Sequence, residues 1–236
     1  MNTKNALSNR KYDTAIFDLD GTLLNTLGDL TDSVNFALKS CGFPIHTESE
    51  IKAYVGNGIA KLIDRAVPKE ASDEEKIKTL ELFRKHYSMN CENKTQPYEG
   101  IPELLAALQT AGLKLAVVSN KIDSAVSKLC KKYFGSYIMF SVGDREGLAR
   151  KPAPDAVLEV LKQLESAPEN AIYIGDSDVD IQTAKNAGMD CISVTWGFRD
   201  KNFLIRHGAS FTVDKPSAIM KILVPEDEIN ISYKSP

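Results

Sequence analysis

The chain has 236 residues, enough for one large domain or for a main domain with a smaller one. Hydrophobic residues make up 43% of it and charged residues 26%, so it can bury a core and has the balance of an ordinary globular protein. With a formal net charge of −3 and 29 dispersed basic residues, the sequence offers no electrostatic basis for nucleic-acid binding.

The N-terminal stretch and the cysteines bear on location. Met1 to Lys11 is polar and lacks the apolar centre of a signal peptide, and no apolar run approaches the length of a membrane span. The four cysteines show neither CxxC nor zinc spacing and are typical of reduced thiols, although four could in principle pair. We therefore expect a cytoplasmic protein, monomer or homodimer, with no membrane partner. Ile229–Pro236 is expected to be a loose tail.

The first predicted strand, Thr14–Phe17, leads directly into two carboxylates, Asp18 and Asp20, and a Gly-Thr turn. Side chains two apart on an extended backbone point to the same side, so these two acids can share one small pocket. Unpaired carboxylates at that distance repel each other, and Mg²⁺, which prefers hard oxygen ligands, would remove the repulsion. A solvated Asp-x-Asp turn is the simpler alternative.

Between Leu24 and about Thr95 the spacing of apolar residues becomes helical. One predicted helix stops at Gly42, and another covers Glu74–Met89. A polar stretch, 91–97, is expected to be a hinge. The sequence therefore predicts a small all-α domain at 24–95, inserted after the first strand into a domain made of 1–23 and 96–236.

The rest of the chain alternates short strands with helices, which is typical of an α/β fold with a parallel, Rossmann-like sheet. The further predicted strands are Lys114–Val118, Ile138–Val142, Ala171–Ile174, Cys191–Thr195 and Ser210–Val213. The predicted helices are Pro102–Ala111, Asp123–Tyr133, Ala153–Leu164, Asp178–Ala187 and Pro216–Ile222. Polar groups that follow such strands lie where open α/β sheets bind ligands.

Four short segments resemble, in order, the signatures of the haloacid dehalogenase-like hydrolases, and the likeness runs over roughly residues 12 to 223. The first is the DxDGT segment at Asp18. The second is an apolar run that ends in Ser119-Asn120, the third contains Lys151 before a proline, and the fourth is an acidic segment from Asp176 to Asp180. The helical insertion resembles the α-helical cap of the phosphoglycolate phosphatase-like members.

The resemblance implies a Mg²⁺-dependent phosphatase in which Asp18 is the nucleophile and forms an aspartyl-phosphate. Asp20 would be the general acid and base. An oxygen of Asp18, the backbone carbonyl of Asp20 and the carboxylate of Asp176 would hold Mg²⁺.

Phosphate would be bound by Ser119, the N–H of Asn120, close to a helix start, and Lys151. Asp180 would orient Lys151 or a metal-bound water. Taken singly, each has a structural alternative: Ser119 could cap a helix, Lys151 could be a surface lysine, and Asp176 could offset a helix dipole.

Two further segments resemble the phosphoglycolate phosphatases and bear on the substrate. Gly56, Asn57 and Gly58 resemble a cap loop that covers the active site, although an inter-helix turn would also use them. Lys61 and Arg65, four residues apart, could meet a substrate carboxylate or could be plain surface charge. Arg199, in a Trp-Gly-Phe-Arg segment, is a weaker candidate for an anion contact.

The resemblance favours 2-phosphoglycolate as the substrate. Asp20 argues against dehalogenase activity, in which this position is not acidic, and Asn25 departs from the acid found there in many relatives. A β-phosphoglucomutase-like mutase and a pyrophosphatase of the same fold remain alternatives. A receiver-type module phosphorylated on aspartate is the alternative from another class, but it would be about half this length and would lack the cap.

Overall fold

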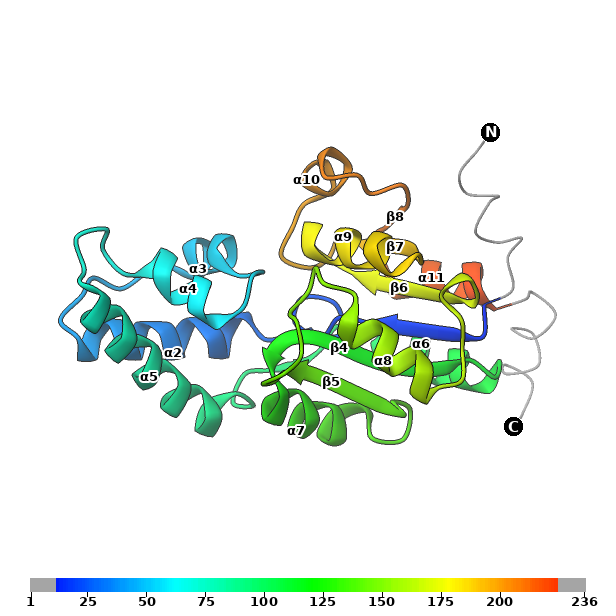
Figure 1. The fold of residues 1–236 in the computed structure, drawn as a ribbon, viewed down its shortest axis with the longest axis horizontal. Coiled ribbons are helices and arrows are strands. Elements are labelled where there is room, and N and C mark those ends of the chain that lie inside the picture. Colours follow the sequence, from blue (N-terminus) through cyan, green and yellow to red (C-terminus); the bar gives the residue numbers. More distant parts are fainter. Residues whose placement is uncertain (1–11, 225–236) are drawn as a thin grey trace. The chain divides into compact units, whose positions relative to one another are not determined.

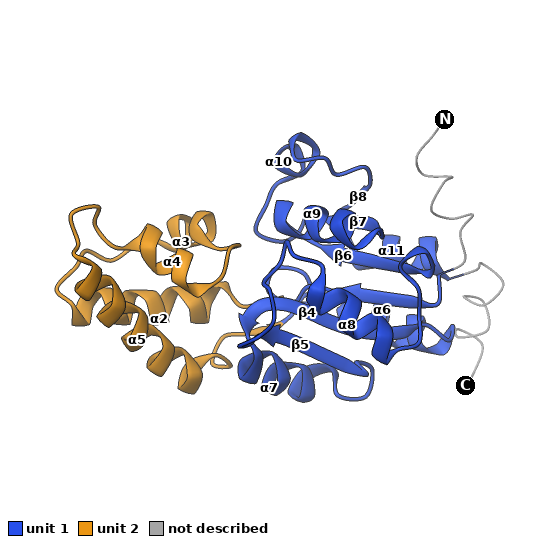
Figure 2. Ribbon diagram, viewed as in Figure 1, with its two compact units in different colours: residues 1–23, 97–236 blue, residues 24–96 orange. Residues whose placement is uncertain are grey.

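The computed structural model describes residues 12–224, so the predicted tail and the N-terminal stretch lie outside the described residues. The chain divides into two compact units (Figure 2). The described part of unit 1 comprises residues 12–23 and 97–224, and unit 2 comprises residues 24–96. These limits differ by a single residue from the predicted domain boundary at 95/96. No helix within 12–224 combines the length and the apolar character needed to cross a membrane.

A six-stranded parallel sheet forms the centre of unit 1, with the strand order β5-β4-β1-β6-β7-β8 (Figure 1). β1 is therefore flanked by β4 and β6, which puts the ends of these three strands side by side. The strands are β1 Thr14–Phe17, β4 Lys114–Ile122, β5 Phe140–Asp144, β6 Ala171–Gly175, β7 Asp190–Val194 and β8 Thr212–Val213.

Helices bury both faces of this sheet. On one face, a core joins α8 and α9 to strand residues such as Ile16, Val118 and Tyr173, which are at most 1% exposed. The alternate residues of β1, Ala15 and Phe17, point to the other face and are also fully buried. The helices of unit 1 are α6 Ile101–Thr110, α7 Asp123–Phe134, α8 Asp155–Gln163, α9 Asp178–Ala187, α10 Lys201–Arg206 and α11 Pro216–Leu223, with a short 3₁₀ helix, η1, at Pro168–Asn170.

Unit 2 is helical between β2 and β3, two short strands that pair with each other near its two ends in the sequence. Two of its helices begin at capping boxes, in which the hydroxyl of Thr47 or Ser72 accepts the N–H of the glutamate three residues on and that glutamate bonds back. The elements are β2 Leu24–Asn25, α2 Leu27–Ser40, α3 Glu48–Tyr54, α4 Ile59–Ala66, α5 Asp73–Asn90 and β3 Gln96–Pro97.

Several strand boundaries are shifted by one to four residues from the predictions, and two of these shifts have a clear cause in the hydrogen bonding. β4 continues four residues beyond Val118, to Ile122, because a register irregularity after Val118 lets its end pair with Asp144 of β5. β5 starts at Phe140, not Ile138, because the N–H groups of Tyr137 and Ile138 bond to the carbonyl of Phe134 at the end of α7. That preceding turn uses the two backbone donors that a longer strand would have needed.

Candidate active site

The register of the sheet brings the predicted site residues together. Phe17 of β1 is level with Val117 of β4 and Ile174 of β6. Asp18 follows directly and donates its N–H to the carbonyl of Ile174 at 2.9 Å. Because neighbouring parallel strands end at the same edge, Asp18, Ser119 and Asp176 come to lie beside one another although the chain separates them widely.

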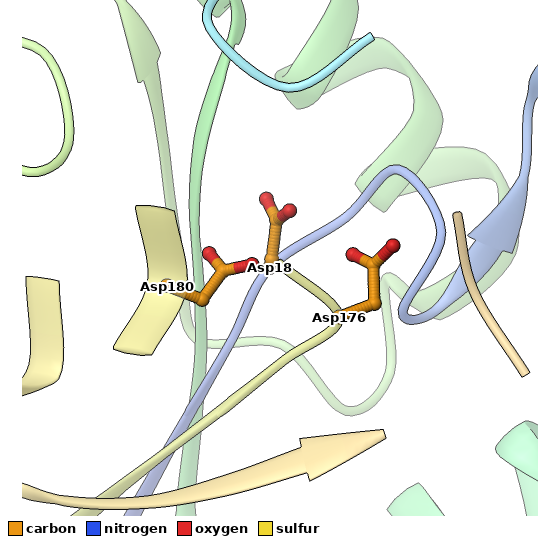
Figure 3. Close-up of side chains that lie close together, drawn as sticks. All are labelled: Asp18, Asp176 and Asp180. Atoms are coloured by element: carbon orange, nitrogen blue, oxygen red, sulfur yellow. The ribbon is translucent and has the colours of Figure 1, made fainter. Parts of the chain in front are cut away.

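Three buried carboxylates gather at this edge, from Asp18, Asp176 and Asp180 (Figure 3). One oxygen from each lies within 4.8 Å of the other two, a spacing that suits a shared cation. Asp18 and Asp176 belong to the predicted ligand set, while the carboxylate of Asp20 is not part of this cluster. Only the backbone carbonyl of Asp20 was expected to bind the metal, so the two sets are compatible.

The electrostatics of the three-carboxylate cluster favour the binding of a cation. Burial raises the pKa of Asp18 to about 6, and the carboxylates of Asp180 and Asp20 act in the same direction against Lys151. Burial also raises the pKa of Asp176 well above its ordinary value, with further contributions from Asp180 and Asp18. Oδ1 of Asp18 is buried without a hydrogen-bond donor in the described chain, apart from its ion-pair contact with Lys151. A divalent cation fits this donor set because it would relieve the repulsion among the buried carboxylates, which Lys151 alone does not offset at Asp18.

Lys151 is the cation that the structure itself supplies. Its side chain is 3% exposed, and its Nζ lies 2.9 Å from Oδ1 of Asp18 and 2.7 Å from Oδ1 of Asp180. Burial lowers the pKa of Lys151, but the charges of Asp18 and Asp180 reverse this and hold it well above its ordinary value. Asp180 is itself fixed, since its Oδ2 accepts the N–H and the hydroxyl of Ser177 in a capping box at the start of α9. The lysine is therefore charged and aimed at Asp18.

Asp176 is held from two sides. Its Oδ1 accepts the hydroxyl of Thr22 at 3.2 Å, and its Oδ2 accepts the N–H of Phe198 at 2.7 Å. Gly21 and Gly197 leave room for it, because a Cβ at either position would come within 2.4 Å of an Asp176 side-chain atom. The Trp-Gly-Phe-Arg segment at 196–199 thus has a structural role in orienting the carboxylate of Asp176.

Ser119 and Asn120 lie within β4 and not at a helix start, because β4 continues to Ile122 and α7 begins only at Asp123. Ser119 is buried, and its hydroxyl oxygen accepts the backbone N–H of Lys121 at 3.4 Å. Asn120 donates its side-chain amide to the carbonyl of Lys151 at 3.0 Å, which ties the second predicted segment to the third.

Two residues that contact the site, Tyr173 and Lys121, were not identified from the sequence. Tyr173 is buried on β6, where its hydroxyl accepts from Nζ of Lys151 at 3.0 Å and donates to the carbonyl of Val118 at 3.1 Å. Lys121 is buried on β4, and its Nζ lies 2.8 Å and 3.1 Å from the two oxygens of Asp20. The sequence features that could have indicated them are a lysine directly after Ser119-Asn120 and a tyrosine within the apolar run before Asp176.

The predicted specificity residues lie apart from this cluster in the sequence. Gly56, Asn57 and Gly58 form the α3–α4 connection of unit 2, with a φ of 133° at Gly56 and 81° at Gly58, which glycine adopts readily. Arg65 spans this loop, donating to the carbonyl of Tyr54 at 2.7 Å and to Oδ1 of Asn57 at 2.6 Å.

Lys61 is 62% exposed and lies 3.7 Å from Asp64. In unit 1, the guanidinium of Arg199 packs over the ring of Phe203 at 5.3 Å. The substrate contacts of these residues remain predictions.

The chain matches the family model of the haloacid dehalogenase-like hydrolases over residues 15–194, a span that includes all four motif segments. The chain belongs to this family. It is 34% identical to the phosphoglycolate phosphatase of Aquifex aeolicus, with 88% of this chain and 95% of that protein covered. It is 31% identical to the phosphoglycolate phosphatase of Vibrio vulnificus, with 88% and 94% covered.

A crystal structure of a candidate phosphoglycolate phosphatase from Lactobacillus delbrueckii matches with a TM-score of 0.87 at 37% identity, covering 92% of this chain and all of that one. The family, these relatives and the acidic site together identify the chain as a phosphoric monoester hydrolase that is similar to the phosphoglycolate phosphatases. The alternative of a receiver-type module does not fit a chain that matches this hydrolase family over residues 15–194.

Proposed function

We propose that this phosphatase hydrolyses 2-phosphoglycolate to glycolate and phosphate, with Mg²⁺ as its cofactor and phospho-Asp18 as the covalent intermediate. The observation that carries the mechanism is the pairing of Asp18 with Lys151 at 2.9 Å inside a buried acidic cluster. The choice of ester rests on the two phosphoglycolate phosphatases named above, because this chain aligns with them over nearly their whole length. We further propose that unit 2 acts as the cap domain and that the enzyme is cytoplasmic.

Mg²⁺ would be held by Asp18, Asp176 and the backbone carbonyl of Asp20. When bound, it supplies positive charge that offsets the repulsion between the phosphate and the carboxylates. Lys151 contributes a second positive charge beside Asp18, where it would bind a phosphate oxygen while keeping its bond to Asp180. Ser119, and the N–H of Asn120, would donate to the remaining oxygens.

In the first step, a carboxylate oxygen of Asp18 attacks phosphorus, and the bond between phosphorus and the ester oxygen breaks. Asp20, protonated at this stage, gives its proton to the departing glycolate oxygen. In the second step, water attacks the phosphorus of phospho-Asp18, and the bond to the Asp18 oxygen breaks. Asp20 takes the proton from that water and is ready for the next cycle.

The test combines a substrate screen with trapping of the intermediate. Purified enzyme with Mg²⁺ is assayed against phosphorylated metabolites, including 2-phosphoglycolate, hexose phosphates and pyrophosphate, with released phosphate as the readout. We expect the highest kcat/KM for 2-phosphoglycolate. A preference for pyrophosphate, or transfer between hexose phosphates without release, would instead support the pyrophosphatase or mutase alternative.

For the covalent step, radiolabelled substrate is mixed with enzyme and quenched in acid within one turnover. We expect label on the wild-type protein and none on Asp18→Asn. With an aryl phosphate, whose leaving group needs little protonation, Asp20→Asn should accumulate label because its second step lacks a base. Label that persists in Asp18→Asn would contradict the assignment of the nucleophile.

A further inference from the structure

Lys121 makes a buried ion pair with Asp20 that the mechanism above does not use. The lysine side chain is 2% exposed and that of Asp20 is 17% exposed. Nζ lies 2.8 Å from Oδ1 and 3.1 Å from Oδ2, so one ammonium faces both carboxylate oxygens. The contact spans 101 positions of the chain and joins β4 to the turn after β1.

A lysine is rarely buried without a reason, because removing its ammonium from water is costly and only a well-placed partner offsets that cost. Asp20 is the partner here, and it lies in the turn that also carries Gly21. An aspartate carboxyl can rotate about two side-chain bonds and would sample several positions in an open turn. A cation that contacts both carboxylate oxygens favours one of these side-chain positions over the others.

Proton transfer depends strongly on that position. A general acid must lie within hydrogen-bond reach of the oxygen it protonates, and a displacement of about 1 Å can slow a reaction by roughly 10²-fold. The strand that carries Lys121 also carries Ser119, whose hydroxyl oxygen accepts the Lys121 N–H. The lysine therefore connects the phosphate-binding strand to the general acid.

We infer that Lys121 is a positioning residue that holds the carboxyl of Asp20 in the orientation from which it exchanges protons. The inference rests on the proposed role of Asp20. In this role Lys121 acts through Asp20 and does not itself bind the phosphate or the leaving group. Its removal should therefore act on the chemical steps and leave the binding of substrate largely intact.

The test is a double-mutant cycle that compares wild type, Lys121→Met, Asp20→Asn and the double variant on 2-phosphoglycolate with Mg²⁺. Methionine keeps an unbranched stem of similar length without the charge. We expect Lys121→Met to lower kcat by about 10–10²-fold with KM changed by less than about 3-fold, a part of the usual worth of acid–base catalysis. In the Asp20→Asn background, the same change should alter kcat by less than about 2-fold.

Lys114→Met is the matched control. Lys114 lies on the same strand, but its ammonium donates to the backbone carbonyl of Leu164, and we expect wild-type kcat. Circular dichroism and thermal melting show which variants are folded. Lys121→Gln, which keeps a donor, is measured in the same cycle and serves if the methionine variant does not fold, with a kcat expected between wild type and Lys121→Met.

Equal losses from Lys121 substitution in both backgrounds would overturn this inference while leaving the proposed function intact. A rise in KM with unchanged kcat would also overturn it, because the lysine would then bind substrate. Wild-type turnover by Asp20→Asn would instead remove the proposed acid–base role, and with it the basis for a positioning residue.

Discussion

Nζ of Lys151 lies 2.9 Å from Oδ1 of Asp18, and both side chains are almost completely buried. This contact gives the carboxylate a positive neighbour before any substrate arrives. It does not neutralise the site, because burial and two further acids still raise the pKa of Asp18 to about 6. The resting site therefore favours additional positive charge.

The first prediction concerns the stability of the site. Burial in the folded protein raises the pKa of Asp18 from its ordinary value of 3.8 to about 6. Between these values the folded state holds the extra proton, so the free energy of unfolding falls as pH rises through the window and stays lower above it. In EDTA at about pH 7.5, Asp18→Asn should therefore be inactive yet more stable by about 2–3 kcal/mol, seen as a melting temperature raised by several degrees.

The gain in stability should shrink toward zero by about pH 3, below both pKa values, where wild-type Asp18 is largely protonated in the folded and the unfolded state. Adding Mg²⁺ should stabilise the wild type more than the variant, because a ligand stabilises only the state that binds it. Melting curves at several pH values with and without Mg²⁺ check this. A difference between the two proteins that does not vary with pH would contradict it.

The second prediction concerns the metal. Activity should require Mg²⁺ and disappear in EDTA, and Ca²⁺ should bind and inhibit. Ca²⁺ accepts 6–8 ligands and often takes both oxygens of a carboxylate, which would leave Asp18 no oxygen for attack. Asp176→Asn should lose most Mg²⁺ binding in calorimetry, because an amide is a weaker ligand for a hard cation.

Asp178→Asn is the matched control for the metal prediction, since it removes a neighbouring acid outside the three-carboxylate cluster. Its Mg²⁺ affinity should match that of the wild type. Full activity in chelator, or equal loss of affinity in Asp176→Asn and Asp178→Asn, would argue against this metal site.

The third prediction concerns the support of Lys151. Tyr173→Phe removes the hydroxyl that accepts from Nζ of Lys151 at 3.0 Å and donates to the carbonyl of Val118. We expect about 1 kcal/mol less stability, as for one lost hydrogen bond, and a kcat lowered by roughly 10-fold because the lysine is less well oriented. Kinetics and denaturant unfolding measure the two effects.

Tyr12→Phe separates these effects. Tyr12 is also buried, and its hydroxyl donates to Asp190 at 2.7 Å, away from the acidic cluster. It should lose comparable stability and keep its kcat. If both variants lose activity in parallel, the effect of Tyr173 is one of general stability.

The fourth prediction concerns the cap residues. Lys61→Ala should lower kcat/KM for 2-phosphoglycolate far more than for p-nitrophenyl phosphate, because only the first carries a carboxylate that needs a cation. Arg65→Ala should show the same preference with an added loss on both substrates, since Arg65 also bonds to Tyr54 and Asn57. Steady-state kinetics with both esters give the comparison.

Lys76→Ala is the control for the cap, because Lys76 contacts the same Asp64 as Lys61, at 3.2 Å and 3.7 Å respectively. It should leave the ratio between the two substrates unchanged. If neither Lys61 nor Arg65 changes that ratio, Arg199 is the next residue to test.

Local patterns in the sequence determined the position of the central strand, the acids that follow it and the helical insertion. The prediction of β1 at Thr14–Phe17 is confirmed. A short apolar run bounded by polar residues can be recognised from these few neighbouring residues alone. The same holds for the start of α7 at Asp123 and for the span of α9, which ends at Gly188 in a left-handed conformation.

Only the tertiary structure decided which side chains support the site. Lys121 reaches Asp20 across 101 positions and Tyr173 reaches Lys151 across 22, and neither residue differs in sequence from an ordinary strand lysine or a core tyrosine. The start of β5 was also decided by contacts, through the turn that ends α7. Such partners depend on which strands lie side by side and in what register, and that arrangement arises from packing of the whole sheet, which no local window of sequence contains.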